Sequence, residues 1–217
     1  SADMLYRPEE LPEKEVWEQS HIFHYGSISL INEPVRETTL KCAELAGANE
    51  NLVSYDPNLR PPLWPDLNTA KKRIKEGLHY ADILKISEEE LEFITGVSNL
   101  KKGCQKLQQY GIDLIFVSLG PQGCYVSHEG QDLKLPTFEV EVEDTTGAGD
   151  GFTAGILYQL VQNKISSLEV LTLESIEKMV KFANAVGSIT TTDKGAIKAL
   201  PYLEQVEDLL ERGQKLD

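Results

Sequence analysis

The amino-acid sequence predicts an α/β fold in which helices cover both faces of a mostly parallel sheet. Three apolar segments, residues 51–55, 82–86 and 113–119, have the length and composition of strands buried inside such a sheet. Segments with helical periodicity lie between them. Strands that alternate with helices pair in parallel, because each helix returns the chain to the edge at which the previous strand began.

The remaining segments extend this pattern. A further strand is expected at residues 21–25, and short antiparallel strands are expected at residues 124–127 and 131–142. Helices are expected at residues 12–20, 33–48, 68–80, 100–110, 152–161, 173–190 and 202–212. With 217 residues and no repeat, low-complexity tract or linker, the chain is expected to form one α/β domain over residues 1–217.

The charge of the chain limits its partners. It carries 21 basic and 35 acidic side chains, so its net charge is 21 − 35 = −14. An acidic surface argues against a nucleic-acid partner, because binding to a phosphate backbone requires basic patches. A small phosphorylated ligand remains compatible with this charge, since backbone amides can bind its phosphates locally.

The cysteines indicate a reducing compartment. Cys42, Cys104 and Cys124 are an odd number and are scattered, so they do not suggest a disulfide framework. The four histidines form no metal-ligand pattern with them. No apolar run approaches the length of a membrane span, and no signal peptide is recognisable, so a cytoplasmic location without a membrane partner is expected.

A glycine-rich turn precedes the apolar segment 152–161. Glycines before a helix let its free N–H groups approach an anion, and the helix dipole favours negative charge there. Asp150 falls in the first turn of this helix, where it could take a proton from a hydroxyl that attacks the anion. The alternative is a structural cap on a core helix, with Asp150 complementing the dipole. The helix itself is expected to be buried all round.

Two common phosphate-binding loops are excluded. A dinucleotide-binding fingerprint would need a third glycine at position 152, where the residue is Phe152. A Walker A loop would need a Gly-Lys pair, and the chain has none.

A proline-rich loop follows the strand at 51–55. Residues 56–65 hold four of the ten prolines and present Asp56, Asn58 and Arg60 at alternate positions. In parallel sheets ligands bind beyond the carboxyl ends of the strands, which favours a binding role for these three side chains. The alternative is a rigid surface loop in which Arg60 makes a structural ion pair.

Ser87 and Glu90 fit a capping box, in which each side chain bonds the backbone N–H of the other at the start of a helix. This structural role can account for both residues. The functional alternative is that Glu90 organises a metal–phosphate complex.

The stretch Asp144-Thr-Thr-Gly-Ala-Gly-Asp150 closely resembles the C-terminal signature of the PfkB (ribokinase-like) carbohydrate kinases. Further segments resemble motifs of the family in the same order along the chain: Lys85-Ile-Ser87-Glu-Glu-Glu90, Ser118-Leu-Gly120-Pro-Gln-Gly123, and Phe182-Ala-Asn184 followed by Lys194-Gly-Ala196. Three segments look most like fructokinases: residues 1–5, residues 23–29, and residues 56–60 with Leu63-Trp64.

The resemblance implies ATP-dependent phosphorylation of a sugar, for fructokinases D-fructose to fructose 6-phosphate. It implies that Asp150 is the base and that the amides of Gly147, Ala148 and Gly149 stabilise the transferring phosphoryl group. It also implies two cation sites: Glu90 binds Mg²⁺ through water, and Asp144 with Thr146 binds a monovalent cation, K⁺. It implies a sugar or phosphate site at Asp56, Asn58 and Arg60. The implied nucleotide site is formed by Ser87, Glu90, Ser118, Gly120, Gly123, Asn184 and Gly187.

The resemblance also implies a three-layer αβα sandwich. Ser87 departs from the family pattern, because it replaces the asparagine of the Asn-x-x-Glu motif. Family members have about 300 residues, and nothing in this chain corresponds to their N-terminal third, which carries the lid and a Gly-Gly sugar-binding motif. The chain is therefore expected to be the C-terminal two thirds of such a kinase, with an exposed sheet edge.

Three functions remain open. The first is a fructokinase, and the second is the same fold acting on another sugar or on a sugar acid of the 2-keto-3-deoxygluconate type. The third is a nucleotide-binding module without catalysis. Association into a homodimer is left open as well.

Overall fold

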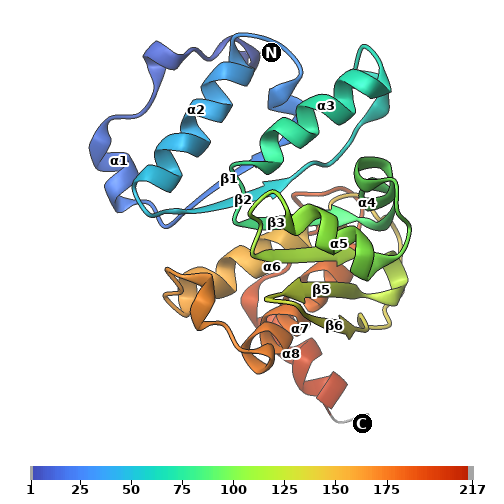
Figure 1. Cartoon of the computed structure of the whole chain (residues 1–217). Helices are drawn as coiled ribbons and strands as arrows, with labels where there is room; N and C mark the ends of the chain where they lie inside the picture. Colours follow the sequence, from blue (N-terminus) through green and yellow to red (C-terminus); the bar gives the residue numbers. More distant parts are fainter. Residues whose placement is uncertain (1, 215–217) are drawn as a thin grey trace. The chain divides into compact units, whose positions relative to one another are not determined.

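The computed structural model describes residues 2–214 (Figure 1). Ser1, the first residue of a segment that resembles fructokinases, lies outside this range. The chain divides into two compact units. The first unit comprises Ser1–Val117 and Val126–Asp132, and the second comprises Ser118–Tyr125 and Leu133–Asp217. The expectation of one domain over the whole chain stays a prediction.

The described residues form one sheet with the strand order β1-β2-β3-β4-β5-β6. β1 pairs in parallel with β2, where Phe23 lies opposite Val53, and β2 pairs in parallel with β3, where Ser54 lies opposite Ile83. This pairing confirms the α/β class. The strands are β1 (Ile22–Gly26), β2 (Leu52–Asp56), β3 (Ile83–Ser87), β4 (Leu114–Ser118), β5 (Cys124–His128) and β6 (Gln131–Leu135).

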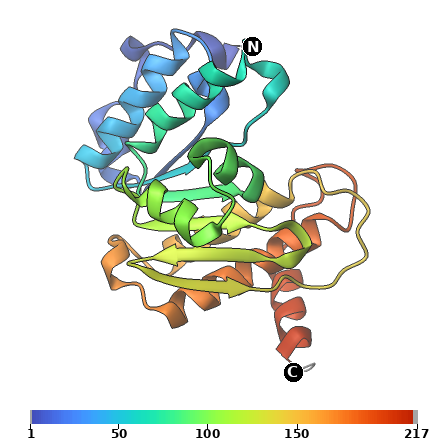
Figure 2. The same cartoon turned by 45° about the vertical axis from the view of Figure 1, so that its right-hand side comes forward.

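In the first unit, helices α2 and α3 lie side by side over one face of β1 and β2 (Figures 1 and 2). All five residues of β2 are buried, as expected for a strand covered on both faces. Tyr25 of β1 stacks on Tyr55 with ring centroids 4.5 Å apart and donates its hydroxyl to the Gly77 carbonyl of α3 at 2.6 Å. The helices of this unit are α1 (Lys14–Gln19), α2 (Val35–Ala48), α3 (Leu67–Leu78), α4 (Glu88–Thr95) and α5 (Leu100–Gln108).

A two-residue turn joins β5 to β6. Glu129 and Gly130 both have positive φ, 48° and 75°, which is the geometry of a type I′ hairpin turn. So short a connection allows only antiparallel pairing, as expected. The expected length of the second strand is wrong, because β6 ends at Leu135 and residues 136–142 have no regular structure. Pro136 has no N–H to donate to a ladder, so the strand stops before it.

The second unit contains α6 (Ala148–Gln162), α7 (Leu173–Thr190) and α8 (Leu203–Gln214). Small side chains let α6 and α7 approach closely: a Cβ on Gly155 would lie 2.7 Å from the Ala183 Cα. Phe182, Val186 and Val206 form a buried cluster between α7 and α8, and Phe138 packs against it from the segment that follows β6.

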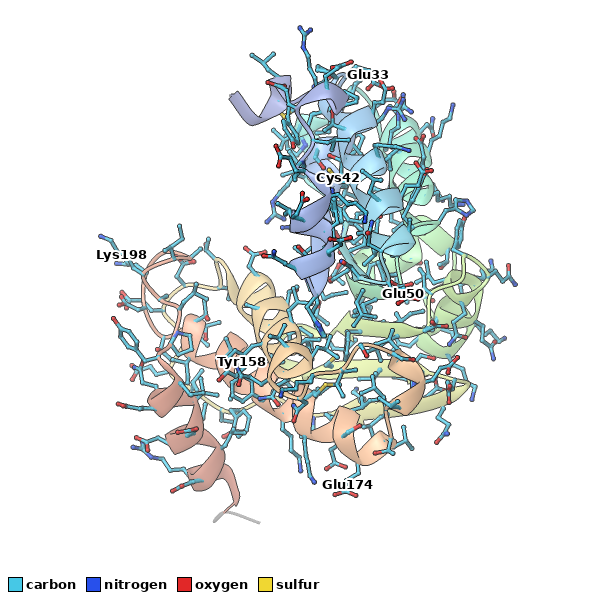
Figure 3. The ribbon with its side chains drawn as sticks, turned by 90° about the vertical axis from the view of Figure 1, so that its left-hand side faces the viewer. Glu33, Cys42, Glu50, Tyr158, Glu174 and Lys198 are labelled. Carbon is cyan, nitrogen blue, oxygen red and sulfur yellow. The ribbon has the colours of Figure 1, made fainter. Side chains whose placement is uncertain are left out.

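Two expectations about helices are corrected. The segment 152–161 is not buried all round, because Ala154, Tyr158 and Val161 are exposed. These residues lie on one stripe of the helix, and the opposite stripe carries its buried residues. Tyr158, labelled in Figure 3, stacks on Phe182 with ring centroids 5.4 Å apart. The first helix starts at Lys14 instead of residue 12, because Glu13 has an extended backbone with φ −62° and ψ 160° and forms the cap. The Pro12 carbonyl accepts the Trp17 indole N–H at 3.2 Å.

The three cysteines are buried thiols that form no disulfide. Burial raises the pKa of the Cys42 thiol to about 11 and that of the Cys104 thiol to about 12. Cys42 lies on α2, and Figure 3 labels it. Within residues 2–214, no helix is both long enough and apolar enough to cross a membrane.

Candidate active site

The first group of expected site residues lies in the first unit, where β2 and β3 end. Because these strands are parallel neighbours, Asp56 at the end of β2 and Ser87 at the end of β3 lie at the same edge of the sheet. We call this set the loop group; its members are Asp56, Asn58, Arg60, Ser87 and Glu90. Contacts link four of the five, and Arg60 is the exception.

Asp56 is buried, with 4% of its surface exposed. One oxygen of its carboxylate lies 3.0 Å from the Lys85 ammonium, and the other accepts the backbone N–H of Asn58 at 3.2 Å. Asn58 has a left-handed backbone, with φ 45°. Asn and Asp adopt this conformation more readily than other side chains, so an asparagine fits the turn that Asp56 imposes.

Glu90 joins the start of α4 to the same loop. Its Oε2 accepts the Ser87 N–H at 2.8 Å, while the Ser87 hydroxyl accepts the Glu90 N–H at 3.1 Å, so the expected capping box is present. Its Oε1 accepts the Leu59 N–H at 2.5 Å. Each carboxylate oxygen has two acceptor sites, so both can still bond a water that binds Mg²⁺. The donor set therefore fits the expected water-mediated role.

Arg60 follows this anchored segment and is exposed. Among the described side chains, those of residues 4–213, no carboxylate lies within ion-pair distance of its guanidinium, so the alternative of a structural ion pair finds no support there. A guanidinium without a protein partner can bind a phosphate or a carboxylate in two parallel hydrogen bonds.

The second group lies in the second unit, at the N-terminus of α6. We call it the turn group; its members are Asp144, Thr146, Gly147, Ala148, Gly149 and Asp150. Gly147 caps the helix with φ 82°, a conformation that side chains other than glycine rarely adopt. A Cβ at this position would also lie 2.7 Å from the Ala196 Cβ, so both the backbone and the packing require glycine.

The first turn of α6 offers amides to an anion. The Ala148 N–H donates to the Thr145 carbonyl at 3.3 Å, and the Gly151 N–H donates to the Gly147 carbonyl at 2.7 Å. The amides of Gly149 and Asp150 have no acceptor within the described part of the chain. Asp150 itself is exposed and lies in this first turn. The turn therefore fits a phosphate bound at a helix N-terminus with a carboxylate beside it.

Asp144 organises the segment before this turn. Its Oδ1 accepts both the hydroxyl and the N–H of Thr146, at 2.7 and 2.9 Å, and its Oδ2 accepts the Gly195 N–H at 3.2 Å. The hydrogen bonds from the Thr146 hydroxyl and N–H, with a further bond from the Gly195 N–H, lower the pKa of Asp144. Asp144 is therefore ionised at neutral pH, as a cation ligand must be.

The donor set suits cations that retain water or other ligands. Within residues 4–213, whose side chains the structure describes, no three His, Cys, Asp or Glu side chains are grouped so that they could hold a metal. Mg²⁺ commonly binds through one or two carboxylates together with phosphates and water, so Mg²⁺ does not require such a group. The Asp144 carboxylate and the Thr146 carbonyl are oxygen donors of the kind that K⁺ accepts.

The expected nucleotide residues have structural contacts of their own. The Asn184 amide donates to the Pro136 carbonyl at 2.8 Å, and a Cβ on Gly123 would lie 2.0 Å from the Leu135 carbonyl oxygen. Gly123 and Asn184 therefore meet at the corner that follows β6. Gly187 lies against the Ala148 carbonyl, where a Cβ would be 3.1 Å away. Ser118 ends β4, and Gly120 begins the turn after it.

Sequence reasoning placed four residues that support these groups within family-like segments but gave them no site role. Lys85 and Leu59 hold the loop group, and Gly195 and Ala196 hold the turn group. A signal for Lys85 was present, since extending the parallel register places it opposite Asp56. Backbone amides leave no such signal in the sequence.

Comparison with known proteins gives the same class. The pfkB family of carbohydrate kinases matches residues 2–203. A probable fructokinase-2 from Arabidopsis thaliana is 46% identical over 202 residues, which are 93% of this chain and 60% of the relative. The chain therefore spans about three fifths of that relative's length.

Two solved structures of fructokinases are similar as well. The enzyme from Vibrio cholerae O395, bound to fructose, ADP and calcium, superposes with a TM-score of 0.86 at 33% identity, covering 97% of this chain and 66% of the other. The enzyme from Xylella fastidiosa with bound ATP superposes with a TM-score of 0.90 at 30% identity, covering 97% and 67%.

The fold, the turn at the N-terminus of α6 and these matches define a carbohydrate kinase fold of the ribokinase-like type. The chain belongs to the pfkB family of carbohydrate kinases.

Proposed function

We propose that the protein to which this chain belongs is an ATP-dependent sugar kinase that converts D-fructose and ATP to fructose 6-phosphate and ADP. The single observation that carries the proposal is the turn group, in which Gly147 opens α6 and an exposed Asp150 lies beside amides without acceptors in the described chain. The similarity to plant and bacterial fructokinases supports the choice of fructose.

Asp150 takes the proton from the sugar hydroxyl that attacks the terminal phosphoryl group of ATP. Its exposure in the first turn of α6 supports this role, because a general base must reach the substrate directly or through one water. The amides of Gly147, Ala148 and Gly149 stabilise the negative charge that develops on the phosphoryl group, and the Ala148 amide exchanges its 3.3 Å bond to the Thr145 carbonyl for this contact. Asn58 and Arg60 bind the sugar or the phosphates, and Asp56 supports them.

The nucleotide and the cations are bound by further residues. Ser118, Gly120, Gly123, Asn184 and Gly187 line the nucleotide site, and Ser87 assists through the start of α4. Glu90 holds the water shell of Mg²⁺, which neutralises phosphate charge when it is bound. Asp144 and the Thr146 carbonyl bind K⁺; two structures of the Vibrio cholerae enzyme contain calcium and potassium respectively, which supports the use of two kinds of cation.

The test is ADP release by the whole protein with fructose, ATP and Mg²⁺, compared between the wild type and Asp150→Ala. We expect Asp150→Ala to lower kcat by about 10²–10⁴-fold, the usual contribution of general-base catalysis, while ATP binding is retained. Asp208→Asn, which changes an exposed carboxylate on α8, is the matched control and should leave turnover unchanged.

The same assay separates the alternatives. A panel of sugars and sugar acids, including an acid of the 2-keto-3-deoxygluconate type, identifies another substrate if fructose is not the best one. ATP binding without turnover on any of them would instead indicate a non-catalytic nucleotide-binding protein. Unchanged turnover in Asp150→Ala would contradict the assignment of the base. A cytoplasmic location and association into a homodimer stay predictions; the three buried cysteine thiols support the first.

A further inference from the structure

Lys85 and Asp56 form a largely buried ion pair between two neighbouring strands of the first unit. The Lys85 Nζ lies 3.0 Å from the Asp56 Oδ2, and the two side chains are 11% and 5% exposed. The β2–β3 register, with Ser54 opposite Ile83 and Tyr55 opposite Leu84, places the pair directly across the strands. Cross-strand neighbours on one face are close enough for such a contact.

An ion pair at this depth needs an explanation other than stability. Desolvation of two charges opposes their attraction, and apolar side chains of similar volume often replace such a pair without loss of stability. Ion pairs elsewhere in the described chain have at least one partner that is more than a quarter exposed, such as Lys101 with Asp132, at 61% and 17%. We therefore expect the charges of Lys85 and Asp56 to determine the local conformation at the end of β2.

The second oxygen of Asp56 shows what the pair controls. It accepts the Asn58 N–H at 3.2 Å, and Asn58 has the left-handed backbone with φ 45°. Rotation of the Asp56 carboxylate would break this bond and release the turn. The Lys85 ammonium opposes that rotation by holding the other oxygen.

Two further contacts fix the residues on either side. The Ser27 N–H donates to the Pro57 carbonyl at 3.1 Å, and the Leu59 N–H donates to the Glu90 carboxylate at 2.5 Å. Three consecutive contacts therefore tie residues 56–59 to the end of β1, to β3 and to α4. Arg60 comes immediately after them and is exposed.

We propose that Lys85 is a positioning residue: through Asp56 it fixes the turn at Asn58 and so sets the direction in which Asn58 and Arg60 face the substrate. Lys85 does not touch the substrate in this proposal. The effect on the reaction rests on the proposed sugar kinase function, whereas the ordering of the loop does not.

The experiment has two readouts on the same variants of the whole protein. Lys85→Met removes the charge and retains the length of the side chain, Lys85→Arg retains the charge, and Lys101→Met is the matched control at a second Lys–Asp pair of the same 3.0 Å distance. Hydrogen exchange followed by mass spectrometry measures the amides of Asn58 and Leu59, and steady-state kinetics measure KM and kcat for fructose and for ATP.

We expect Lys85→Met to accelerate exchange at Asn58 and Leu59 at least tenfold, with no change at the α2 and α3 amides. KM should rise about tenfold for the substrate that Asn58 and Arg60 bind, either the sugar or the phosphates of ATP, because both residues lose their orientation. KM for the other substrate should stay within twofold. Lys85→Arg should largely retain both the slow exchange and the KM of the wild type, and Lys101→Met should behave as the wild type. A merely structural role would change exchange throughout the unit and both KM values together.

Each contrary result has one meaning. Unchanged exchange at Asn58 and Leu59 overturns the proposal whatever the kinetics show. Faster exchange with unchanged kinetics in an active kinase overturns the role in the reaction. A wild-type protein without sugar kinase activity overturns the proposed function, while the exchange data still decide whether Lys85 orders the loop. Lys85→Gln, which retains a polar head group, takes the place of Lys85→Met if that variant does not fold.

Discussion

The Glu90 carboxylate accepts the backbone N–H of Leu59, a residue 31 positions earlier, at 2.5 Å. The same carboxylate caps α4 through the Ser87 N–H. One side chain therefore bonds a helix start and a loop at once, so the capping role and the proposed cation role of Glu90 are compatible parts of one arrangement.

Replacement of Glu90 should cost stability as well as activity. Glu90→Ala leaves the amides of Ser87 and Leu59 without their acceptor, and we expect the free energy of unfolding to fall by about 1–3 kcal/mol. Glu90→Gln retains one carbonyl oxygen as an acceptor, so its free energy of unfolding should fall less. Urea unfolding measures both. Glu89→Ala changes an exposed carboxylate in the same first turn; an equal loss in Glu89→Ala would show that the effect is one of helix charge alone.

Gly147→Ala tests the cap of α6. A left-handed backbone costs a residue with a Cβ about 1–2 kcal/mol, and the contact of 2.7 Å with Ala196 adds to this cost. Gly96→Ala is the control, because Gly96 has φ 71° and its Cβ would meet nothing within 4 Å. Urea unfolding should show a larger loss for Gly147→Ala than for Gly96→Ala. Similar losses would mean that the contact with Ala196 relaxes freely.

Asp82→Asn should stabilise the protein at neutral pH. Burial raises the pKa of Asp82, while its bond from the Val53 N–H, at 2.7 Å, lowers it less. The folded protein therefore binds the proton more tightly than the unfolded chain, and its stability falls as pH rises above the unfolded pKa of about 3.9. The amide side chain of the variant does not titrate, and its carbonyl oxygen can still accept the Val53 N–H.

The difference between Asp82→Asn and the wild type should thus be absent near pH 3 and grow above pH 4, as urea midpoints across this range would show. Asp66→Asn is a control of opposite sign. The Thr69 hydroxyl and N–H lower the pKa of Asp66, so its ionised form is favoured in the folded protein and its loss should destabilise at neutral pH. Shifts of the same sign in both variants would contradict this account.

Asp144→Asn should remove the dependence on K⁺. The variant loses the negative charge and weakens the acceptor for the Gly195 N–H, so the oxygen donors proposed for the cation are weakened as well. We expect the ratio of kinase rates in K⁺ and Na⁺, measured at equal ionic strength, to approach one. Glu143→Gln changes the neighbouring acid, which pairs with Lys194 at 3.3 Å, and should retain the ratio of the wild type. A wild type with equal rates in both salts would refute the cation site.

The positions of the elements could largely be predicted from the sequence, because local signals set them. The helix expected at residues 173–190 is α7 residue for residue, with Thr172 as its cap. One error overlooked a local signal, and the other depended on a non-local condition. Residues 136–142 alternate like a strand but begin with a proline, and the exposed stripe of α6 depends on what packs against the helix.

In the candidate site, too, some contacts could be predicted from the sequence and others could not. The capping box of Ser87 with Glu90 spans three residues, so its spacing is visible in the sequence. The bonds from Leu59 to Glu90 and from Gly195 to Asp144 span 31 and 51 residues and use backbone amides, which every residue but proline provides. No sequence pattern could have indicated them.

The buried cysteines make the protein suitable for site-directed labelling. Thiol reagents attack the thiolate, and burial keeps the pKa of Cys42 at about 11 and that of Cys104 at about 12, with Cys124 only 1% exposed. The native thiols should therefore stay inert toward maleimides at neutral pH. A fluorophore could be attached through Val161→Cys on the exposed stripe of α6, with all three native cysteines left in place.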